Sequence, residues 1–197
     1  MNIVSNNCLG GFIYRDILKC EYQNPFIWTS INHLELLDII KNFNSINFSN
    51  MSIDRDGNGL SNNFITVIDD KYRIFNHHIQ FSIKDNVPRN VGNNVYYNKP
   101  WEYIVEKYDK RLKRMNNKID CVALYWPEAP EDYLKVLIKT CKEHNCKCLI
   151  ITNKLKSEKY NSKDVKIIEF YTSEKSQWEI PLEKQCTKEI LEFLNRE

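Results

Sequence analysis

The C-terminal part of the chain most constrains the fold, because it alternates apolar strands with amphipathic helices. Three short apolar runs, at residues 120–125, 148–152 and 165–170, have the pattern of buried strands. Helical patterns lie between and after them, at residues 130–144 and 181–194. Continuous apolar strands separated by helices are typical of a parallel sheet covered on both faces. The pattern predicts an α/β fold of three layers, with a mostly parallel sheet flanked by helices.

The N-terminal part adds a strand, a helix and an antiparallel hairpin to this frame. Residues 1–4 are an apolar strand pattern, and a helical pattern with Ile13 and Ile17 on one side follows. Two β-type runs, at residues 64–68 and 72–81, flank a polar turn and predict a hairpin.

The remaining segments complete one domain. Helices are expected at residues 34–43, capped by Ser30 or Asn32, and at residues 101–115. The other two segments are polar and are expected to be irregular loops, at residues 44–63 and 84–98. No internal repeat occurs, so we expect a single α/β domain over residues 1–197, with the hairpin and a long polar loop inserted between its halves.

Composition and charge argue against several classes of protein. The formal net charge of +2 is too small to indicate a nucleic-acid partner. No apolar run is long enough for membrane insertion, and the N-terminus lacks the pattern of a secretory signal. Seven cysteines without an export signal fit a reducing compartment, so the expected location is cytoplasmic. No Gly-rich phosphate loop or Gly-x-Ser-x-Gly elbow occurs, and no cofactor is expected.

Two segments partly match metal-binding patterns. The first is a local cluster made of Cys141, His144, Cys146 and Cys148. It lacks the Cys-x-x-Cys pairs that zinc sites use, so no metal is expected, and a local Cys/His site is the alternative. Residues 54–59 match the start of a calcium loop, but Ile65 occupies the position of the bidentate Glu. A polar turn is the better interpretation.

Cys8 is the candidate nucleophile. It follows the N-terminal strand at the start of the expected helix, where unpaired amides and the helix dipole favour a thiolate. The backbone amides of Leu9 and Gly10 would then supply the oxyanion donors. The structural alternative is that Asn6 or Asn7 caps the helix and that Cys8 is a small buried side chain.

Two adjacent histidines, His77 and His78, offer a base for this thiol. Neighbouring residues of a strand point to opposite faces, so one imidazole faces the core or a cleft and the other faces solvent. A thiol–imidazole pair needs a histidine held on such a rigid element. An Asn or Asp would orient the imidazole. The candidates for that third group are Asn76, Asp69, Asp70, Asp85 and Asp120.

The N-terminal motif resembles that of an uncharacterised bacterial family found in polysaccharide-biosynthesis clusters. Residues 5–11 read Ser-Asn-Asn-Cys-Leu-Gly-Gly and are followed by Tyr14. A Ser-Asn-Asn-Cys-Trp-Gly-Gly start is typical of that family, and Leu9 stands here in place of its Trp. The resemblance implies a protein of exopolysaccharide biosynthesis.

A longer set of motifs resembles a second uncharacterised bacterial family, of the papain-like cysteine peptidase type. That family has an Asn-Cys start, a Pro-Phe-aromatic segment, a Phe-x-His-Asp-Phe strand and a basic Lys-Tyr-x-Arg-Arg helix. The matching positions are Asn7-Cys8, residues 25–28, residues 75–79 and residues 107–111. His78 stands where that family has Asp, and Ile79 where it has an aromatic residue. The resemblance implies that Cys8 is the nucleophile and His77 its base.

Residues that could bind substrate come from these motifs and from the expected sheet edge. Asn7 and Trp28 belong to the motifs. Arg111 lies among basic residues of the helix expected in the middle of the chain, whose default role is a solvated face and whose alternative role is contact with phosphate groups. Trp126 and Glu128 follow a buried strand, where open parallel sheets bind ligands. The alternative for Glu128 is a charge at a helix start.

These features lead to three functional hypotheses. The first is a cysteine-dependent hydrolase or transferase acting on an acyl, peptide or glycan-type substrate. The second is a polysaccharide-biosynthesis protein that binds a glycan or nucleotide-sugar without cysteine chemistry. The third is an interaction protein without a cleft.

Overall fold

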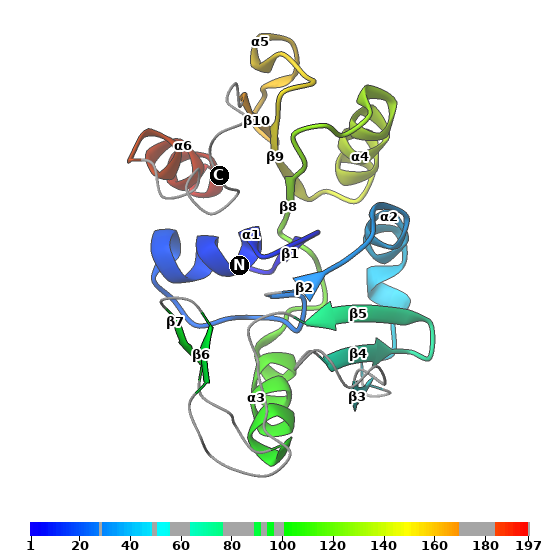
Figure 1. The fold of residues 1–197 in the computed structure, drawn as a ribbon. Helices are drawn as coiled ribbons and strands as arrows, with labels where there is room; N and C mark the ends of the chain where they lie inside the picture. Colours follow the sequence, from blue (N-terminus) through cyan, green and yellow to red (C-terminus); the bar gives the residue numbers. More distant parts are fainter. Residues whose placement is uncertain are drawn as a thin grey trace.

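The computed structural model has an α/β fold built around a parallel sheet (Figure 1). It describes residues 1–27, 29–48, 51–55, 64–76, 89–91, 94–96, 101–169 and 184–196. The main sheet has four strands in the order β1-β8-β9-β10, and all neighbouring pairs are parallel. The strands are β1 (Ile3–Ser5), β8 (Cys121–Tyr125), β9 (Lys147–Thr152) and β10 (Val165–Glu169).

Helices cover both faces of this sheet and make it the middle of three layers (Figure 1). One face is covered by α1 (Leu9–Phe12), its π-helical continuation η1 (Ile13–Leu18) and α6 (Lys184–Leu194). The other face is covered by α2 (His33–Asn42) and α4 (Glu131–Glu143). Because the central strands are buried on both sides, their sequences are continuously apolar, and the expected parallel sheet is confirmed.

A second, antiparallel sheet lies in the insertion between β1 and β8, in the order β2-β5-β4-β3. Its strands are β2 (Thr29–Ser30), β3 (Met51–Arg55), β4 (Phe64–Ile68) and β5 (Tyr72–Asn76). The predicted hairpin is β4–β5, and Asp69 and Asp70 form its turn with φ of 55° and 53°. Positive φ at two successive turn residues suits the twist of a tight hairpin.

The two stretches expected to be irregular loops contain strands, so that part of the prediction is wrong. The first stretch contains β3, and the second contains β6 (Arg89–Val91) and β7 (Asn94–Tyr96), which pair with each other. These strands are three to five residues long. Such short runs carry too little alternation to stand out from polar sequence, and their partners decide their structure.

Three further helices follow α2, precede β8 and separate β9 from β10, respectively. They are η2 (Phe43–Ser45), α3 (Trp101–Arg114) and α5 (Ser157–Tyr160). Of the two predicted caps of α2, Asn32 is the one used: its side-chain oxygen accepts from the amides of Leu34 and Glu35 at 3.0 and 2.9 Å.

Side chains satisfy main-chain groups of β1, which is an edge strand of the main sheet. The amide of Ile3 donates to the Tyr14 hydroxyl at 3.0 Å, and that hydroxyl donates to the carbonyl of Met1 at 2.6 Å. The side-chain amide of Asn24 donates to the carbonyl of Ile3 at 2.8 Å. A buried edge needs such partners, and they fix the strand that leads to Cys8.

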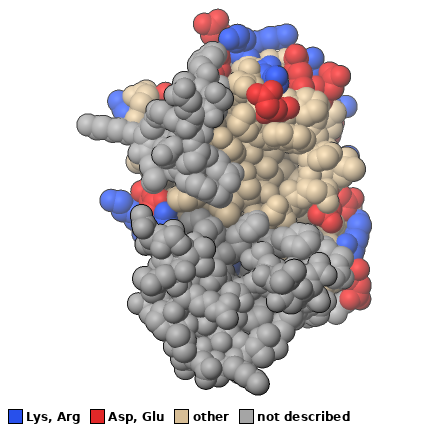
Figure 2. Space-filling view, in the orientation of Figure 1, with Lys and Arg blue, Asp and Glu red and all other residues tan. Residues whose placement is uncertain are grey.

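Charges of both signs are mixed on the described surface. Figure 2 shows Lys and Arg next to Asp and Glu along its upper and right-hand borders, with uncharged side chains between them. This mixture agrees with the small net charge of +2. No helix among the described residues is long and apolar enough to cross a membrane.

Candidate functional site

The segments that follow β1 and β8 lie on opposite faces of the main sheet, and the space between the ends of these two strands is a candidate site. The two strands are parallel neighbours, with Ile3 opposite Cys121 and Ser5 opposite Ala123. After β1 the chain continues into α1 on one face, whereas after β8 it continues into α4 on the other (Figure 1). In open α/β sheets, ligands bind outside the carboxyl ends of strands at such a switch point.

Asparagine side chains join the ends of the two strands at this point. The side-chain oxygen of Asn6 accepts from the amide of Tyr125 at 3.1 Å, and its nitrogen donates to the Tyr125 carbonyl at 3.2 Å. The side-chain nitrogen of Asn7 donates to the same carbonyl at 3.1 Å. The Asn6 side chain therefore extends the hydrogen bonding between β1 and β8 beyond the end of β1, as a backbone group would. Together, Asn6 and Asn7 tie the turn before Cys8 to the end of β8.

Two further bonds close this turn from inside. The hydroxyl of Ser5 accepts from the amide of Gly10 at 3.0 Å and donates to the carbonyl of Asn7 at 2.6 Å. The side-chain oxygen of Asn7 accepts from the amide of Leu9 at 3.0 Å. The amides of Leu9 and Gly10, predicted to be oxyanion donors, are thus already bonded within the turn. A local polar side chain can always compete for a helix-start amide.

Cys8 lies at the N-cap position of α1 but is buried, with 2% of its surface exposed. Burial raises the pKa of its thiol to about 12. The thiolate expected from the helix start is therefore not the resting state. The reason is that desolvation outweighs the dipole of a helix that has only four residues before it turns into a π-helix.

The histidines expected to serve this thiol, His77 and His78, lie outside the described residues, as does Trp28. The structure does place Asn76, which directly precedes His77 in the chain: it pairs with Thr29 of β2. The segment around β2 is tied to the Cys8 turn, because the amide of Ile31 donates to the carbonyl of Asn6 at 2.9 Å. The strand β5, which ends at Asn76, therefore pairs with β2, and the residue that follows β2 bonds to the Cys8 turn.

Trp126 lies at the carboxyl edge of the sheet, directly after β8. Its half-buried ring contacts the rings of His33 and Tyr133, with centroids 5.3 and 5.5 Å away. The Tyr133 hydroxyl also donates to the carbonyl of His33 at 3.2 Å. The sequence did not indicate this grouping, because its members come from separate segments.

Glu128 follows at the same edge and is fully exposed. It accepts from the side-chain nitrogen of Asn153 and pairs with Lys154, both at 2.6 Å. Hydrogen bonds from Lys154 and Asn153 lower its pKa. The acids in the first turn of α4 are Glu131 and Asp132, so Glu128 joins the ends of β8 and β9 instead of charging the helix start.

Arg111 is not part of a solvated basic face, because its side chain is completely buried. Its guanidinium donates to the carbonyl of Ile27 at 3.5 Å and lies 5.0 Å from the centre of the Tyr22 ring. The neighbouring Arg114 pairs with Glu21. Arg111 therefore ties α3 to the segment that precedes β2, and it lies in the interior instead of on the solvated face that the basic run predicted.

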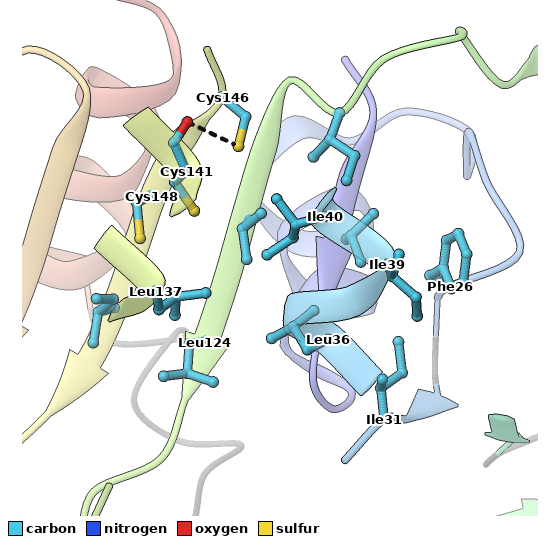
Figure 3. Close-up of a cluster of buried hydrophobic side chains, with 14 of the residues drawn as sticks. Phe26, Ile31, Leu36, Ile39, Ile40, Leu124, Leu137, Cys141, Cys146 and Cys148 are labelled. Carbon is cyan, nitrogen blue, oxygen red and sulfur yellow. Dashed lines mark hydrogen bonds between the residues drawn. The ribbon is translucent and has the colours of Figure 1, made fainter. Parts of the chain in front are cut away.

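The cysteine cluster lies in the apolar core. Cys141, Cys146 and Cys148 pack beside Leu137 and Leu124 (Figure 3), and the Cys146 thiol donates to the carbonyl of Cys141 at 3.5 Å. His144 is exposed. Within the described residues, no group of three or more His, Cys, Asp or Glu side chains is arranged to hold a metal ion. Of the segment that matches the start of a calcium loop and was interpreted as a polar turn, Asp54 and Arg55 belong to β3, and residues 56–59 lie outside the described residues.

Comparison of this chain with protein-family models, with curated proteins and with solved structures finds no match.

Proposed function

We propose that this chain is a cysteine-dependent acyl or amide hydrolase or transferase, with Cys8 as its nucleophile. The observation that carries the proposal is the place of Cys8 in the fold. It lies where the chain leaves the carboxyl end of β1 and enters α1, at the switch point between β1 and β8. Hydrogen bonds from Ser5, Asn6 and Asn7 hold this turn in one geometry, and rigid support is what a catalytic group requires.

A neutral thiol needs a base during the attack. With a pKa of about 12, Cys8 has almost no thiolate at neutral pH. The motif resemblance assigns that base to His77. Asn76, the last described residue before His77, pairs with Thr29, and the amide of Ile31 bonds to Asn6 of the Cys8 turn.

The proposed reaction proceeds in two steps. The Cys8 sulfur bonds to the carbonyl carbon while its proton passes to the base. The tetrahedral intermediate then releases the alcohol or amine, which takes that proton, and a thioester remains. Water or another acceptor attacks the thioester, the carbon–sulfur bond breaks, and the thiol recovers its proton. Water as the acceptor makes the chain a hydrolase, and an amine or sugar hydroxyl makes it a transferase.

The test uses p-nitrophenyl acetate as an activated acyl donor. The folded protein is treated at pH 7.5, p-nitrophenolate release is followed, and the acetylated residue is located by peptide mass spectrometry. We expect acetyl transfer to Cys8, strong loss of that transfer in His77→Ala, and retention in His78→Ala. The exposed Cys20 is the internal reference for non-specific acetylation. Acetylation of Cys20 without any on Cys8 would contradict the proposal.

The second candidate function is binding of a glycan or nucleotide-sugar at the same edge without cysteine chemistry. This function is favoured because Cys8 is buried and because the amides of Leu9 and Gly10 already donate hydrogen bonds to Asn7 and Ser5. In that case Trp126 is the contact residue. Titration with UDP-glucose and with glucose, followed by ligand-observed NMR, should then show binding that Trp126→Ala removes and Cys8→Ala preserves.

A further inference from the structure

The turn at the end of α4 brings two thiols together. Asn145, which follows this helix, has a φ of 53°, in the left-handed region. Its amide donates to the carbonyl of Lys142 at 3.2 Å. The next amide, of Cys146, donates to the carbonyl of Cys141 at 3.0 Å. These two bonds around a left-handed residue make a Schellman motif, in which the residue after the turn contacts the last turn of the helix. Here both contacting positions are cysteines.

The side chains of Cys141 and Cys146 are neighbours in consequence. The Cys146 thiol donates to the carbonyl of Cys141 at 3.5 Å (Figure 3). A hydrogen bond with the Cys141 thiol, together with burial, raises the pKa of the Cys146 thiol, so the two sulfur atoms lie within hydrogen-bonding reach. Both cysteines are free. A disulfide needs two thiols held at short range, and the Schellman motif supplies that arrangement.

A small pocket reaches Cys146 but not its partner. The pocket has a volume of about 50 Å³, and its lining includes Cys146 and residues from the ends of α2 and α4. Cys146 is 3% exposed, whereas Cys141 and Cys148 are completely buried. A pocket of this size has room for a molecule slightly larger than water. Hydrogen peroxide is such a molecule, and iodoacetamide is not.

Basic side chains line the same pocket. They are the exposed Lys41, Lys118 and His144, and the described lining residues include no acid. Lys118 also pairs at 3.4 Å with Asp120, which is outside this lining. Positive charge near a thiol favours its thiolate, the form that peroxide oxidises. The lysines therefore offset part of the effect of burial at Cys146.

We infer that Cys141 and Cys146 form a site of reversible thiol oxidation, with hydrogen peroxide as the oxidant. The Cys146 sulfur attacks one peroxide oxygen, the oxygen–oxygen bond breaks, and the leaving hydroxide takes the thiol proton. The products are a sulfenic acid and water. The Cys141 sulfur then attacks the Cys146 sulfur, and the sulfenic oxygen leaves as a second water with the Cys141 proton. Two thiols are thereby oxidised to one disulfide, and one peroxide is reduced to two waters. The site is separate from Cys8 and does not depend on the proposed function.

The test treats the folded protein with hydrogen peroxide, blocks the remaining thiols in denaturant and maps each cysteine by peptide mass spectrometry. Trypsin separates the three cysteines, because Lys142 follows Cys141 and Lys147 follows Cys146. We expect a disulfide that joins Cys141 to Cys146 and that dithiothreitol reverses, with Cys148 still reduced. The global unfolding rate is measured in parallel, and the disulfide should form faster than the protein unfolds.

Variants identify the attacked thiol. In Cys141→Ala the disulfide should be lost, and Cys146 should remain as a sulfenic acid that dimedone added with the denaturant traps. Cys148→Ala is the matched control and should form the disulfide at the wild-type rate. Melting temperatures show that each variant is folded before treatment, and the mapping in the wild type decides the inference even if one of them is not.

The pocket has its own pair of variants. Lys118→Gln removes a positive charge from the lining and should slow disulfide formation several-fold, whereas Lys139→Gln, on α4 but outside the pocket, should not. A disulfide that forms only at the unfolding rate would overturn the inference, and so would thiols that stay reduced or a disulfide between Cys141 and Cys148.

Discussion

The turn that holds Cys8 and the core around Cys141, Cys146 and Cys148 bury their thiols in different surroundings. Apolar side chains from α4, β8 and β9 enclose the core thiols (Figure 3). Cys8 is also buried, and burial raises its pKa to about 12, but hydrogen bonds of Ser5 and Asn7 surround its backbone. Burial alone therefore does not distinguish a structural cysteine from a candidate nucleophile. What sets Cys8 apart from the core cysteines is its place in a hydrogen-bonded polar turn at the edge of the sheet.

The largest effect is expected in the apolar region. Leu137 is completely buried beside the core cysteines (Figure 3). Leu137→Ala should lower the free energy of unfolding by about 3 kcal/mol, because it removes buried methyl groups and leaves a cavity. Denaturant titration measures this. The matched control is Val136→Ala on the same helix, whose exposed side chain should cost less than about 0.5 kcal/mol. Equal losses in the two variants would contradict the assignment of the core.

The polar turn should respond to a single added methyl group. A Cβ at Gly10 would lie 2.7 Å from the Ser5 hydroxyl oxygen. Gly10→Ala should therefore destabilise the protein by about 2 kcal/mol, as overpacking does, measured by thermal unfolding. Ser5→Ala removes that oxygen, so the double variant Ser5→Ala/Gly10→Ala should recover part of the loss. Strictly additive effects in this double-mutant cycle would show that the two residues do not meet.

Alkaline pH should destabilise the folded state, because buried thiols such as that of Cys8 ionise more readily in the unfolded chain. In the unfolded chain Cys8 ionises near 9.0, whereas in the folded state it keeps its proton until about pH 12. Its contribution to stability is complete below pH 9 and is lost as pH rises toward 12. Cys8→Ala should therefore reduce the fall in unfolding free energy by about 1.4 kcal/mol per pH unit in this window.

Two cysteine variants serve as references for that experiment. Cys121 is completely buried in the sheet and burial raises its pKa, so Cys121→Ala should reduce the alkaline slope as Cys8→Ala does. Cys20→Ala removes an exposed thiol and is the matched control. A slope in Cys8→Ala that equals that of the wild type would mean that Cys8 reaches solvent in the folded state.

The smallest effect concerns the link between β1 and β8. Asn6→Ala removes two hydrogen bonds to the backbone of Tyr125 and should cost about 1 kcal/mol. It should also speed hydrogen exchange of the Tyr125 amide, while amides of β9 remain protected. Asn153→Ala, which loses a bond to the exposed Glu128, is the control. Unchanged exchange at Tyr125 would contradict the bridging role of Asn6.

Local pattern was sufficient to predict the main sheet. The central strands β8 and β9 are almost entirely apolar because both of their faces are covered, and the edge strand β10 keeps Val165, Ile167 and Ile168 buried. That signal needs no knowledge of partners. The hairpin at Asp69 and Asp70 was predictable for the same reason, since turn chemistry is local. The short strand β3 was not, because pairing with β4 creates it.

The candidate site shows where local reasoning ends. The place of Cys8 between β1 and α1 follows from neighbouring residues, but its raised pKa comes from burial by segments distant in sequence. Arg111 belongs to a basic run, yet Tyr22 and Ile27, far away in the chain, enclose it. The bonds that occupy the Leu9 and Gly10 amides depend on side-chain geometry that spacing does not specify.

The most direct test of the central claim is the alkylation rate of each cysteine in the folded protein. Isotope-coded iodoacetamide and peptide mass spectrometry resolve Cys8 from Cys141 and Cys148, and the global unfolding rate is measured in parallel. If Cys8 is a nucleophile, the reagent must reach it without global unfolding, so Cys8 will be alkylated faster than the protein unfolds. The core cysteines will be labelled only at the unfolding rate. Labelling of Cys8 together with the core cysteines, at the unfolding rate, would contradict the claim and make Cys8 a structural residue.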